Sequence, residues 1–510
     1  MQKTAVFIAL LLLTITANAQ RKAPATPQGN ATFKNMLGVN AFEWDFLNPK
    51  DASILATDKM DIIESFGGVR HYLDWQKIEP KKGSFTFNPT HDGGWNYDII
   101  YQRCKQDGID MLVDIKTCPD WLLESYPANL RDGENIPMPF GAKRDAPVSY
   151  IEQAKAGFQF AARYGSNKNV DPALVTVDPK QRWTGDGINV VKIGLGTVKY
   201  VECDNERDKW WKGTKAQQSA EEYAANMSAF YDGDKGRLGK GVGVKNADPN
   251  MKVVMAGLSK PEPGYVQRMI NWCKIHRGYK ADGSVNLCFD VINFHYYNNT
   301  PNSKRGVAPE LSSAAELADG FVQLGKANHL PVWVTETGYD INPGSPQRAI
   351  AVGSKSVLLT QADWIIRTAF LYARHGISKV FFYELNDDNI GNPTQFSSSG
   401  LTDKGKRRPA ADFIYQAKNL LGDYSYAGTI SKYPLIDVYR NGSKTIYALM
   451  LPSESGSTFM ATLNLGNATN ATEYQFNPGS NDVIKTPLKA TGHSVKIKVG
   501  ETPVFVEKVD

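Results

Sequence analysis

Two glutamates stand at the ends of apolar segments, each among other polar side chains. Glu206 closes the stretch "TVKYVECDNE", and Glu336 closes "PVWVTE". Two carboxylates that face each other across a cleft are what cleavage of a glycosidic bond requires, because one protonates the leaving oxygen and the other acts at the anomeric carbon. The alternative is that each is an ordinary surface or ion-paired glutamate.

Eight short apolar segments alternate with helical stretches along the chain. Their continuous hydrophobicity indicates a parallel sheet that is buried on both faces. Eight strand–helix repeats are the count of a closed (β/α)8 TIM barrel, in which functional side chains gather at the carboxyl ends of the strands. An open doubly wound sheet is the alternative, but no glycine-rich phosphate loop follows any strand. The predicted strands are 36–42, 67–73, 109–115, 198–202, 251–257, 289–295, 331–336 and 378–384.

Glu206 and Glu336 therefore follow the fourth and seventh strands, and both strand ends resemble those of the clan A retaining glycoside hydrolases, as in families 5 and 39. In that clan the fourth strand typically ends in Asn-Glu, whose glutamate is the acid/base, and the seventh ends in the nucleophilic glutamate. The resemblance implies that Glu206 is the acid/base, that Asn205 binds the sugar 2-hydroxyl and that Glu336 is the nucleophile. It covers roughly residues 36 to 422.

Further residues extend the resemblance. Arg70 in "VRHYLDW" matches the clan's arginine near the nucleophile, and His295 and Tyr297 in "NFHYYN" match its His-x-Tyr. A Tyr297 hydroxyl bonded to Glu336 would hold that carboxylate ionised, because hydrogen bonding to the charged form favours it. A plain surface arginine and a histidine packed in the barrel wall are the alternatives.

The end of the eighth strand departs from the clan's pattern. Clan A enzymes commonly place a tryptophan there as a floor for the cleaved sugar, whereas this sequence has "VFFYELNDDN". Tyr383 can supply the aromatic face instead. The departure leaves open which sugar that subsite holds.

Several tryptophans follow the predicted strands. Trp44, Trp75 and Trp121 come after the first three, and Trp210 and Trp211 come after the fourth. Flat aromatic faces suit sugar rings, and we predict that Trp44, Trp75, Trp121 and Trp211 bind an oligosaccharide. Each of them taken singly can equally be a packing residue.

Composition excludes several other functions. The formal net charge is +5, and no basic stripe with interleaved aromatic residues is present, so no nucleic-acid partner is expected. The five cysteines form no CxxC pair, and "NDDN" lacks the spacing of a calcium loop, so we expect no metal and no cofactor. Cys273 and Cys288 flank one connection and can pair after export.

The two ends of the chain differ from the barrel. Residues 1–19 have the charged, apolar and small-residue regions of an export signal, and residues 20–35 form a polar leader. The apolar run is too short to span a membrane. After the barrel (36–422), alternating short segments around Asn441-Gly442 predict an antiparallel β-sandwich over 423–510 that supports the barrel.

These features together predict a secreted or periplasmic retaining β-glycoside hydrolase. Its expected partner is an oligo- or polysaccharide such as a β-glucan or hemicellulose, cleaved by double displacement, and tryptophans on both sides of the carboxylate pair favour endo action. An exo-acting β-xylosidase or β-glucosidase is the nearest alternative, and a catalytically inactive carbohydrate-binding barrel is the alternative from another class. A monomer is expected, although nothing in the sequence specifies the oligomeric state, the sugar or the linkage.

Overall fold

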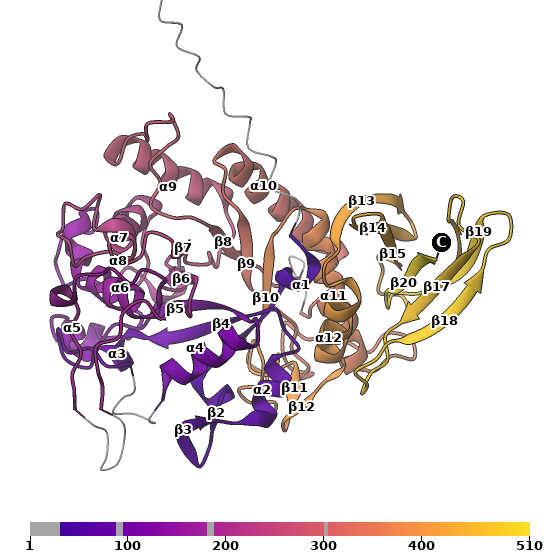
Figure 1. The fold of residues 1–510 in the computed structure, drawn as a ribbon, viewed down its shortest axis with the longest axis horizontal. Coiled ribbons are helices and arrows are strands. Elements are labelled where there is room, and N and C mark those ends of the chain that lie inside the picture. Colours follow the sequence, from indigo (N-terminus) through magenta and orange to yellow (C-terminus); the bar gives the residue numbers. More distant parts are fainter. Residues whose placement is uncertain (1–30, 88–94, 181–187, 300–303, 510) are drawn as a thin grey trace, which may run out of the picture.

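Eight parallel strands form a nearly closed barrel in the computed structural model, which describes residues 31–87, 95–180, 188–299 and 304–509 (Figure 1). Neighbouring strands are hydrogen-bonded in the order β7-β6-β5-β4-β1-β10-β9-β8, and isolated bridges join β7 to β8. Each predicted strand overlaps one of them, so the TIM barrel is confirmed. The strands are β1 (Leu37–Ala41), β4 (Gly68–Asp74), β5 (Asp110–Lys116), β6 (Tyr200–Cys203), β7 (Lys252–Met255), β8 (Ile292–His295), β9 (Val332–Thr337) and β10 (Lys379–Phe382).

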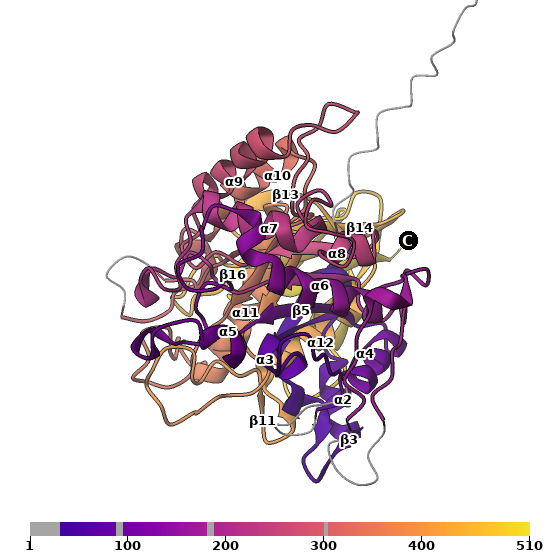
Figure 2. The same cartoon turned by 90° about the vertical axis from the view of Figure 1, so that its left-hand side faces the viewer.

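Helices surround these strands, as the two views at right angles show (Figure 1 and Figure 2). Their boundaries follow local sequence signals: Ser219 and Glu222 form a capping box at the start of α7, and Pro409 opens α12. The main helices are α2 (Thr57–Ile63), α4 (Tyr97–Gln106), α6 (Ile151–Tyr164), α7 (Ala220–Asp232), α9 (Pro263–His276), α10 (Ala314–Ala327), α11 (Val357–Arg374) and α12 (Pro409–Leu421), and the short ones are α1 (Phe33–Met36), α3 (Trp75–Ile78), α5 (Asp120–Leu123) and α8 (Val244–Ala247).

The predicted leader differs from the structure at its end. The expected polar segment runs to residue 35, whereas residues 33–36 form α1. The Phe33 ring is fully buried and stacks on Phe370 of α11 at 5.0 Å. Burial of one aromatic ring therefore outweighs the polar character of the residues before it. The predicted export signal lies outside the described residues.

The C-terminal part is an antiparallel β-sandwich, as predicted. Six strands pair in the order β13-β14-β15-β20-β17-β18, and β16 pairs with β19 in a second, two-stranded sheet. The predicted turn at Asn441-Gly442 joins β14 to β15, and Gly442 has a φ of 58°, a left-handed conformation that favours glycine. The strands are β13 (Ser425–Lys432), β14 (Leu435–Asn441), β15 (Lys444–Met450), β16 (Phe459–Asn464), β17 (Asn470–Gln475), β18 (Ile484–Lys489), β19 (Ser494–Val499) and β20 (Val504–Val509).

The sandwich packs on the outer helices of the barrel beside α11 and α12 (Figure 1). Phe413 of α12 stacks on Phe476 with ring centroids 4.2 Å apart. Arg374 of α11 forms a 2.8 Å ion pair with the buried Asp437 of β14. An apolar contact and a partly buried ion pair thus join the sandwich to the helices of the barrel, and its predicted supporting role stays a prediction.

The five cysteines are buried and carry free thiols. Cys273 in α9 and Cys288 before β8 lie side by side, with Sγ atoms 3.4 Å apart. The two thiols are adjacent, and the predicted pairing stays a prediction. Among the helices of the described ranges, none is both long enough and apolar enough to cross a membrane.

Candidate active site

The barrel brings Glu206 and Glu336 together at its carboxyl end. Glu206 follows β6, Glu336 is the fifth residue of β9, and His295 ends β8 between them. His295 Nδ1 lies 2.8 Å from Glu206 Oε1 and 3.5 Å from Glu336 Oε2. One carboxylate oxygen of each glutamate and a ring nitrogen of the histidine all lie within 4.8 Å of one another. The two glutamates are therefore a facing pair and not separate surface residues.

The backbone after β6 turns sharply to present Glu206. Asp204 and Glu206 have φ values of 69° and 50°, in the left-handed region that costs an ordinary residue about 1 kcal/mol. Asp204 supports this turn, because its carboxylate accepts hydrogen bonds from the Asn205 backbone (2.7 Å) and from Arg207 (3.2 Å). Asp204 is thus a buried support of the turn.

Glu336 is surrounded by donors. Its Oε1 accepts hydrogen bonds from the Tyr72 hydroxyl (2.5 Å) and Arg70 Nη1 (2.8 Å), and its Oε2 accepts one from the Tyr297 hydroxyl (3.1 Å). Burial opposes ionisation, but the charges of His295 and Arg70 and the bond from Tyr72 outweigh it, so the pKa of Glu336 is lowered. This carboxylate is held in its ionised form.

The surroundings of Glu206 act in the opposite direction. Burial first, and then the negative charge of Glu336, raise the pKa of Glu206, although the bond with His295 acts against them. The Thr335 hydroxyl accepts a hydrogen bond from Asn293 (2.8 Å), so its own proton can point to His295 Nε2 (3.0 Å). Burial lowers the pKa of His295, but the charge of Glu336 and the bond with Glu206 outweigh it and raise this pKa. A proton is therefore favoured on Nδ1, the ring nitrogen that faces both glutamates, and it is donated to Glu206 Oε1. Glu206 Oε2 is then the oxygen that can carry the acidic proton.

Asn205 lies beside this pair. Its side-chain oxygen accepts a hydrogen bond from Arg70 Nη2 at 2.8 Å, which orients the amide. Within the described part of the chain its amide nitrogen donates to no protein acceptor. That nitrogen is available to a ligand hydroxyl, as the predicted role requires.

The barrel interior also holds charged groups that the sequence analysis missed. Arg70 is fully buried and donates to both oxygens of Glu202, at 2.7 and 3.1 Å, and to Asp114 at 3.2 Å. Burial, followed by the charge of Glu202, raises the pKa of Asp114 well above its usual range and favours its protonated form. The sequence signal for Asp114 and Glu202 is a lone charged residue within an apolar strand. The signal for Tyr72 is its position two residues after Arg70, on the same face of the strand.

Aromatic rings continue outward from Glu336. Phe42 stacks on Tyr72 at 5.2 Å and on Trp44 at 4.5 Å, and about half of the Trp44 side chain is exposed (48%). Tyr383 follows β10, is half-buried, and meets Tyr72 edge to face at 6.5 Å. Trp44 and Tyr383 therefore connect to the Glu336 side through Tyr72, and their predicted contacts with a sugar stay predictions.

The predicted sugar-binding role of Trp75 is wrong. It is only 1% exposed, and its Nε1 donates to Glu79 Oε2 at 2.5 Å. Trp121 packs edge to face on Trp75 at 5.6 Å, and its Nε1 donates to the Glu79 carbonyl at 2.9 Å. Trp75 is thus a core residue that cannot stack on a sugar, because position after a strand does not reveal which way a ring turns. Trp121 is half-buried, and its predicted role stays a prediction.

The loop after β6 exposes two tryptophans. Trp210 is 65% exposed and Trp211 is 48% exposed, with ring centroids 6.0 Å apart and ring planes at 89°. Because the two ring planes are nearly perpendicular, only one of the two rings can stack flat on a given sugar ring. The sequence analysis selected Trp211.

Glu206, His295 and Glu336 are also close enough to hold a metal ion among them. The Arg70 guanidinium, 2.8 Å from Glu336, already supplies positive charge there. A second cation at this carboxylate would be repelled, so the chemistry of the donor set favours proton transfer over metal binding. The expected lack of a metal and of a cofactor stays a prediction.

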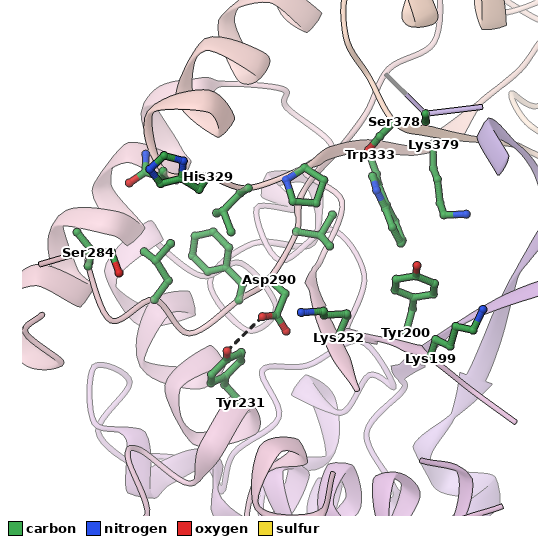
Figure 3. A pocket seen from close by; sticks show the side chains of 18 of the residues that line it. Lys199, Tyr200, Tyr231, Lys252, Ser284, Asp290, His329, Trp333, Ser378 and Lys379 are labelled. Carbon is green, nitrogen blue, oxygen red and sulfur yellow. Dashed lines mark hydrogen bonds between the residues drawn. The ribbon is translucent and has the colours of Figure 1, made fainter. Parts of the chain in front are cut away.

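A large cavity of about 1120 Å³ lies at the other end of the barrel, at the amino ends of the strands (Figure 3). Its wall is fixed by ion pairs, since Asp110 contacts Lys379 at 2.9 Å and Lys199 at 3.1 Å, and by a bond from Tyr231 to Asp290. In TIM barrels, residues at the amino ends of the strands serve stability, whereas catalytic residues lie at the carboxyl ends. Size alone therefore does not make this cavity the active site.

No protein-family model and no curated protein matches the sequence, but solved structures share its fold. A family 39 glycoside hydrolase from the gut symbiont Bacteroides cellulosilyticus aligns over 94% of this chain and 82% of its own, with a TM-score of 0.62 and 16% identity. A family 30 subfamily 8 xylanase from Clostridium acetobutylicum (TM-score 0.55, 11% identity) covers 94% and 97%, and a family 51 α-L-arabinofuranosidase from Bifidobacterium longum (0.54, 12%) covers 96% and 98%. This likeness confirms the fold, a TIM barrel with a β-sandwich.

Proposed function

We propose that the protein is a retaining β-glycoside hydrolase that cleaves a polysaccharide by double displacement. The observation that carries this proposal is the facing pair of glutamates, one held ionised and one disposed to keep its proton, with oxygens within 4.8 Å. A retaining pair is about 5 to 5.5 Å apart, whereas an inverting pair needs roughly 6.5 to 9.5 Å to admit a water. The short separation therefore supports retention.

In the first step Glu336 Oε2 or Oε1 attacks the anomeric carbon while Glu206 transfers its proton to the leaving oxygen. The glycosidic bond breaks, and a glycosyl ester of Glu336 forms. In the second step Glu206, now ionised, takes a proton from water, whose oxygen attacks the anomeric carbon and releases Glu336. Both glutamates return to their starting states, and two inversions retain the β configuration.

The substrate class follows from the surroundings of the pair. Exposed rings lie after two of the strand ends: Trp44 connects to the Glu336 side through Phe42 and Tyr72, and Trp210 and Trp211 stand in the loop that follows Glu206. Rings on both sides suit a chain that extends in both directions, which supports endo action on a β-glucan or hemicellulose over the exo-acting alternative. The family 30 and family 51 structures are a xylanase and an arabinofuranosidase, so xylan is the first substrate to test.

We also propose that the chain is exported to the periplasm or the medium and acts as a monomer. The support for export is the charged, apolar and small-residue pattern of residues 1–19. Sequencing of the mature N-terminus checks it, since cleavage after Ala19 leaves Gln20 first. A mature chain that retains the apolar segment would contradict it.

The experiment that tests the function combines a substrate panel with two variants. The wild-type protein is incubated with xylans, β-glucans and mannans, and the products are separated by chromatography. Oligomers indicate endo action and monomers indicate exo action. Glu336→Gln should abolish turnover of every glycoside, whereas Glu206→Gln should spare the first step for an activated aryl glycoside that needs no proton.

Azide distinguishes the two roles. Added azide should restore turnover of Glu206→Gln and give a β-glycosyl azide, because the small anion attacks the stranded ester without base catalysis. Rescue of Glu336→Gln in place of Glu206→Gln would reverse the roles. Wild-type activity in both variants would place the site elsewhere, and binding without cleavage of any polysaccharide would favour the inactive carbohydrate-binding barrel.

A further inference from the structure

A cavity of about 340 Å³ lies beside the strand end that carries Glu206. One wall comes from the loop after β6, with Asp208, Trp210 and Gln218, and the other comes from the loop after β7 and the start of α9, with Lys260, Tyr265 and Arg268. The Lys209 backbone N–H donates to the Glu206 carbonyl at 2.9 Å. The turn that presents Glu206 is therefore continuous in the chain with the loop that lines this cavity.

The frame of the cavity is fixed by buried polar contacts. The Asp208 carboxylate accepts hydrogen bonds from the backbone N–H groups of Ser259 (3.0 Å) and Lys260 (2.8 Å), which ties the two loops together. The Tyr265 hydroxyl donates to the Gln218 carbonyl at 3.0 Å. These bonds hold the cavity in shape without help from the Trp210 ring.

Trp210 is the lining side chain that takes no part in these bonds. It is 65% exposed, whereas Trp75, Trp333 and Trp364 are at most 3% exposed and pack in the core. Trp211 stands at 89° to it and does not line the cavity. An exposed indole on a fixed loop offers a large apolar face that loses little conformational freedom when a flat ligand stacks on it.

We propose that this cavity is a leaving-group subsite in which Trp210 stacks on a neutral sugar ring. The inference rests on the proposed function: Glu206 protonates the leaving oxygen, so the leaving-group part of the chain continues on the side of Glu206, where the cavity lies. Trp210, and not the Trp211 selected from the sequence, is then the platform. An enzyme with this subsite is expected to cleave substrates with sugar units on both sides of the cleaved bond more efficiently than substrates with a small leaving group.

The charges of the lining select a neutral sugar over a uronic acid. Lys260 already contacts Glu262 at 2.5 Å, and Arg268 lies 3.7 Å from Glu221. Asp208 adds a further negative charge. A uronate would thus meet no unpaired cation in this cavity, whereas a neutral ring needs only the indole face and the polar rim.

Two substrates with one glycone and different leaving groups test the subsite. The probes are xylohexaose, which fills leaving-group subsites, and β-xylosyl fluoride, whose leaving fluoride occupies none; cellohexaose and β-glucosyl fluoride replace them if the wild type prefers glucans. Trp210→Ala should lower kcat/KM for the hexasaccharide about tenfold, the loss expected for one stacked ring. It should leave kcat/KM for the fluoride unchanged. Trp210→Phe should restore part of the loss. Trp211→Ala compares the neighbouring ring, and Tyr433→Ala, at an exposed ring of the C-terminal sandwich (61%), is the matched control.

The outcomes separate this inference from the proposed function. Equal kcat/KM of Trp210→Ala and wild type on the hexasaccharide would overturn it, as would an equal loss on the fluoride or a larger loss in Trp211→Ala. A higher kcat/KM of the wild type for an oligosaccharide that carries glucuronic acid on its leaving-group side than for a neutral one would overturn the neutral-sugar assignment. If the wild type hydrolysed no polysaccharide of the panel, the proposed hydrolysis would be wrong. Calorimetric affinity for the hexasaccharide would still decide the subsite: about tenfold weaker binding by Trp210→Ala supports the platform, and equal binding refutes it.

Discussion

The Tyr72 hydroxyl should set the acid limit of activity. It accepts a hydrogen bond from Arg70 Nη1 at 2.6 Å and donates to Glu336 Oε1 at 2.5 Å, so its proton is directed at the carboxylate. Tyr72→Phe removes this donor and keeps the ring that stacks on Phe42. The Arg70 and Tyr297 donors to Glu336 remain.

The magnitude follows from the type of bond. A hydrogen bond to a charged group contributes about 1.5 to 3 kcal/mol, and 1.36 kcal/mol changes an ionisation constant tenfold. Loss of the bond disfavours the ionised form, so the pKa of Glu336 rises. The acid limb of the pH profile of kcat/KM should therefore move up by about 1 to 2 pH units, and activity at alkaline pH should change less.

The assay is hydrolysis of an activated aryl glycoside between acid and alkaline pH. Tyr297→Phe is the matched control, because its hydroxyl is 3.1 Å from Glu336 Oε2, and its acid limb should move less. A merely structural role for Tyr72 would lower activity evenly and leave both limbs in place. An unmoved acid limb, or a shift of the alkaline limb alone, would refute the reasoning.

Two further predictions concern residues outside the proton-transfer chemistry. Trp75→Ala should lower the free energy of unfolding in urea by about 3 to 5 kcal/mol, because it leaves a cavity in the core, and should keep the calorimetric affinity for oligosaccharides near wild type. Trp44→Ala should lower that affinity and keep the free energy of unfolding near wild type. Equal effects of the two variants would contradict their assignments. Oxidised glutathione should link Cys273 to Cys288 by disulfide exchange that reduces the glutathione disulfide to two thiols, which mass spectrometry of unreduced peptides detects; labelling of both thiols by an alkylating agent after oxidation and unfolding would show that the pair does not close.

The strand ends could be predicted because their signals are local. Continuous apolar runs bounded by polar residues locate β6 and β9, and the TIM barrel count then places Glu206 and Glu336 at one edge. Arg70, His295 and Tyr297 followed from short matching segments, and the structure brings all three within contact of the pair.

Ring orientation could not be predicted from position in the chain. Trp75 and Trp44 both follow a strand, yet one is fully buried against Glu79 and the other is half exposed on Phe42. The difference depends on helix α3 (Trp75–Ile78), whose first residue turns into the core. Adjacent Trp210 and Trp211 pose the same problem, because a short turn sets their planes at right angles.

The buried arginine explains how the site keeps its charge balanced. Taking Arg70 and Glu202 out of water costs several kcal/mol per ion, and apolar residues of similar size would often be at least as stable. In the resting state Arg70 faces two anions, Glu202 and Glu336, with Asp114 disposed to stay protonated. In the proposed mechanism Glu336 becomes an uncharged ester, and Arg70 is then balanced by Glu202 alone. The negative charge passes to Glu206, where His295 Nδ1–H donates to it, so each intermediate has a partner for every buried charge.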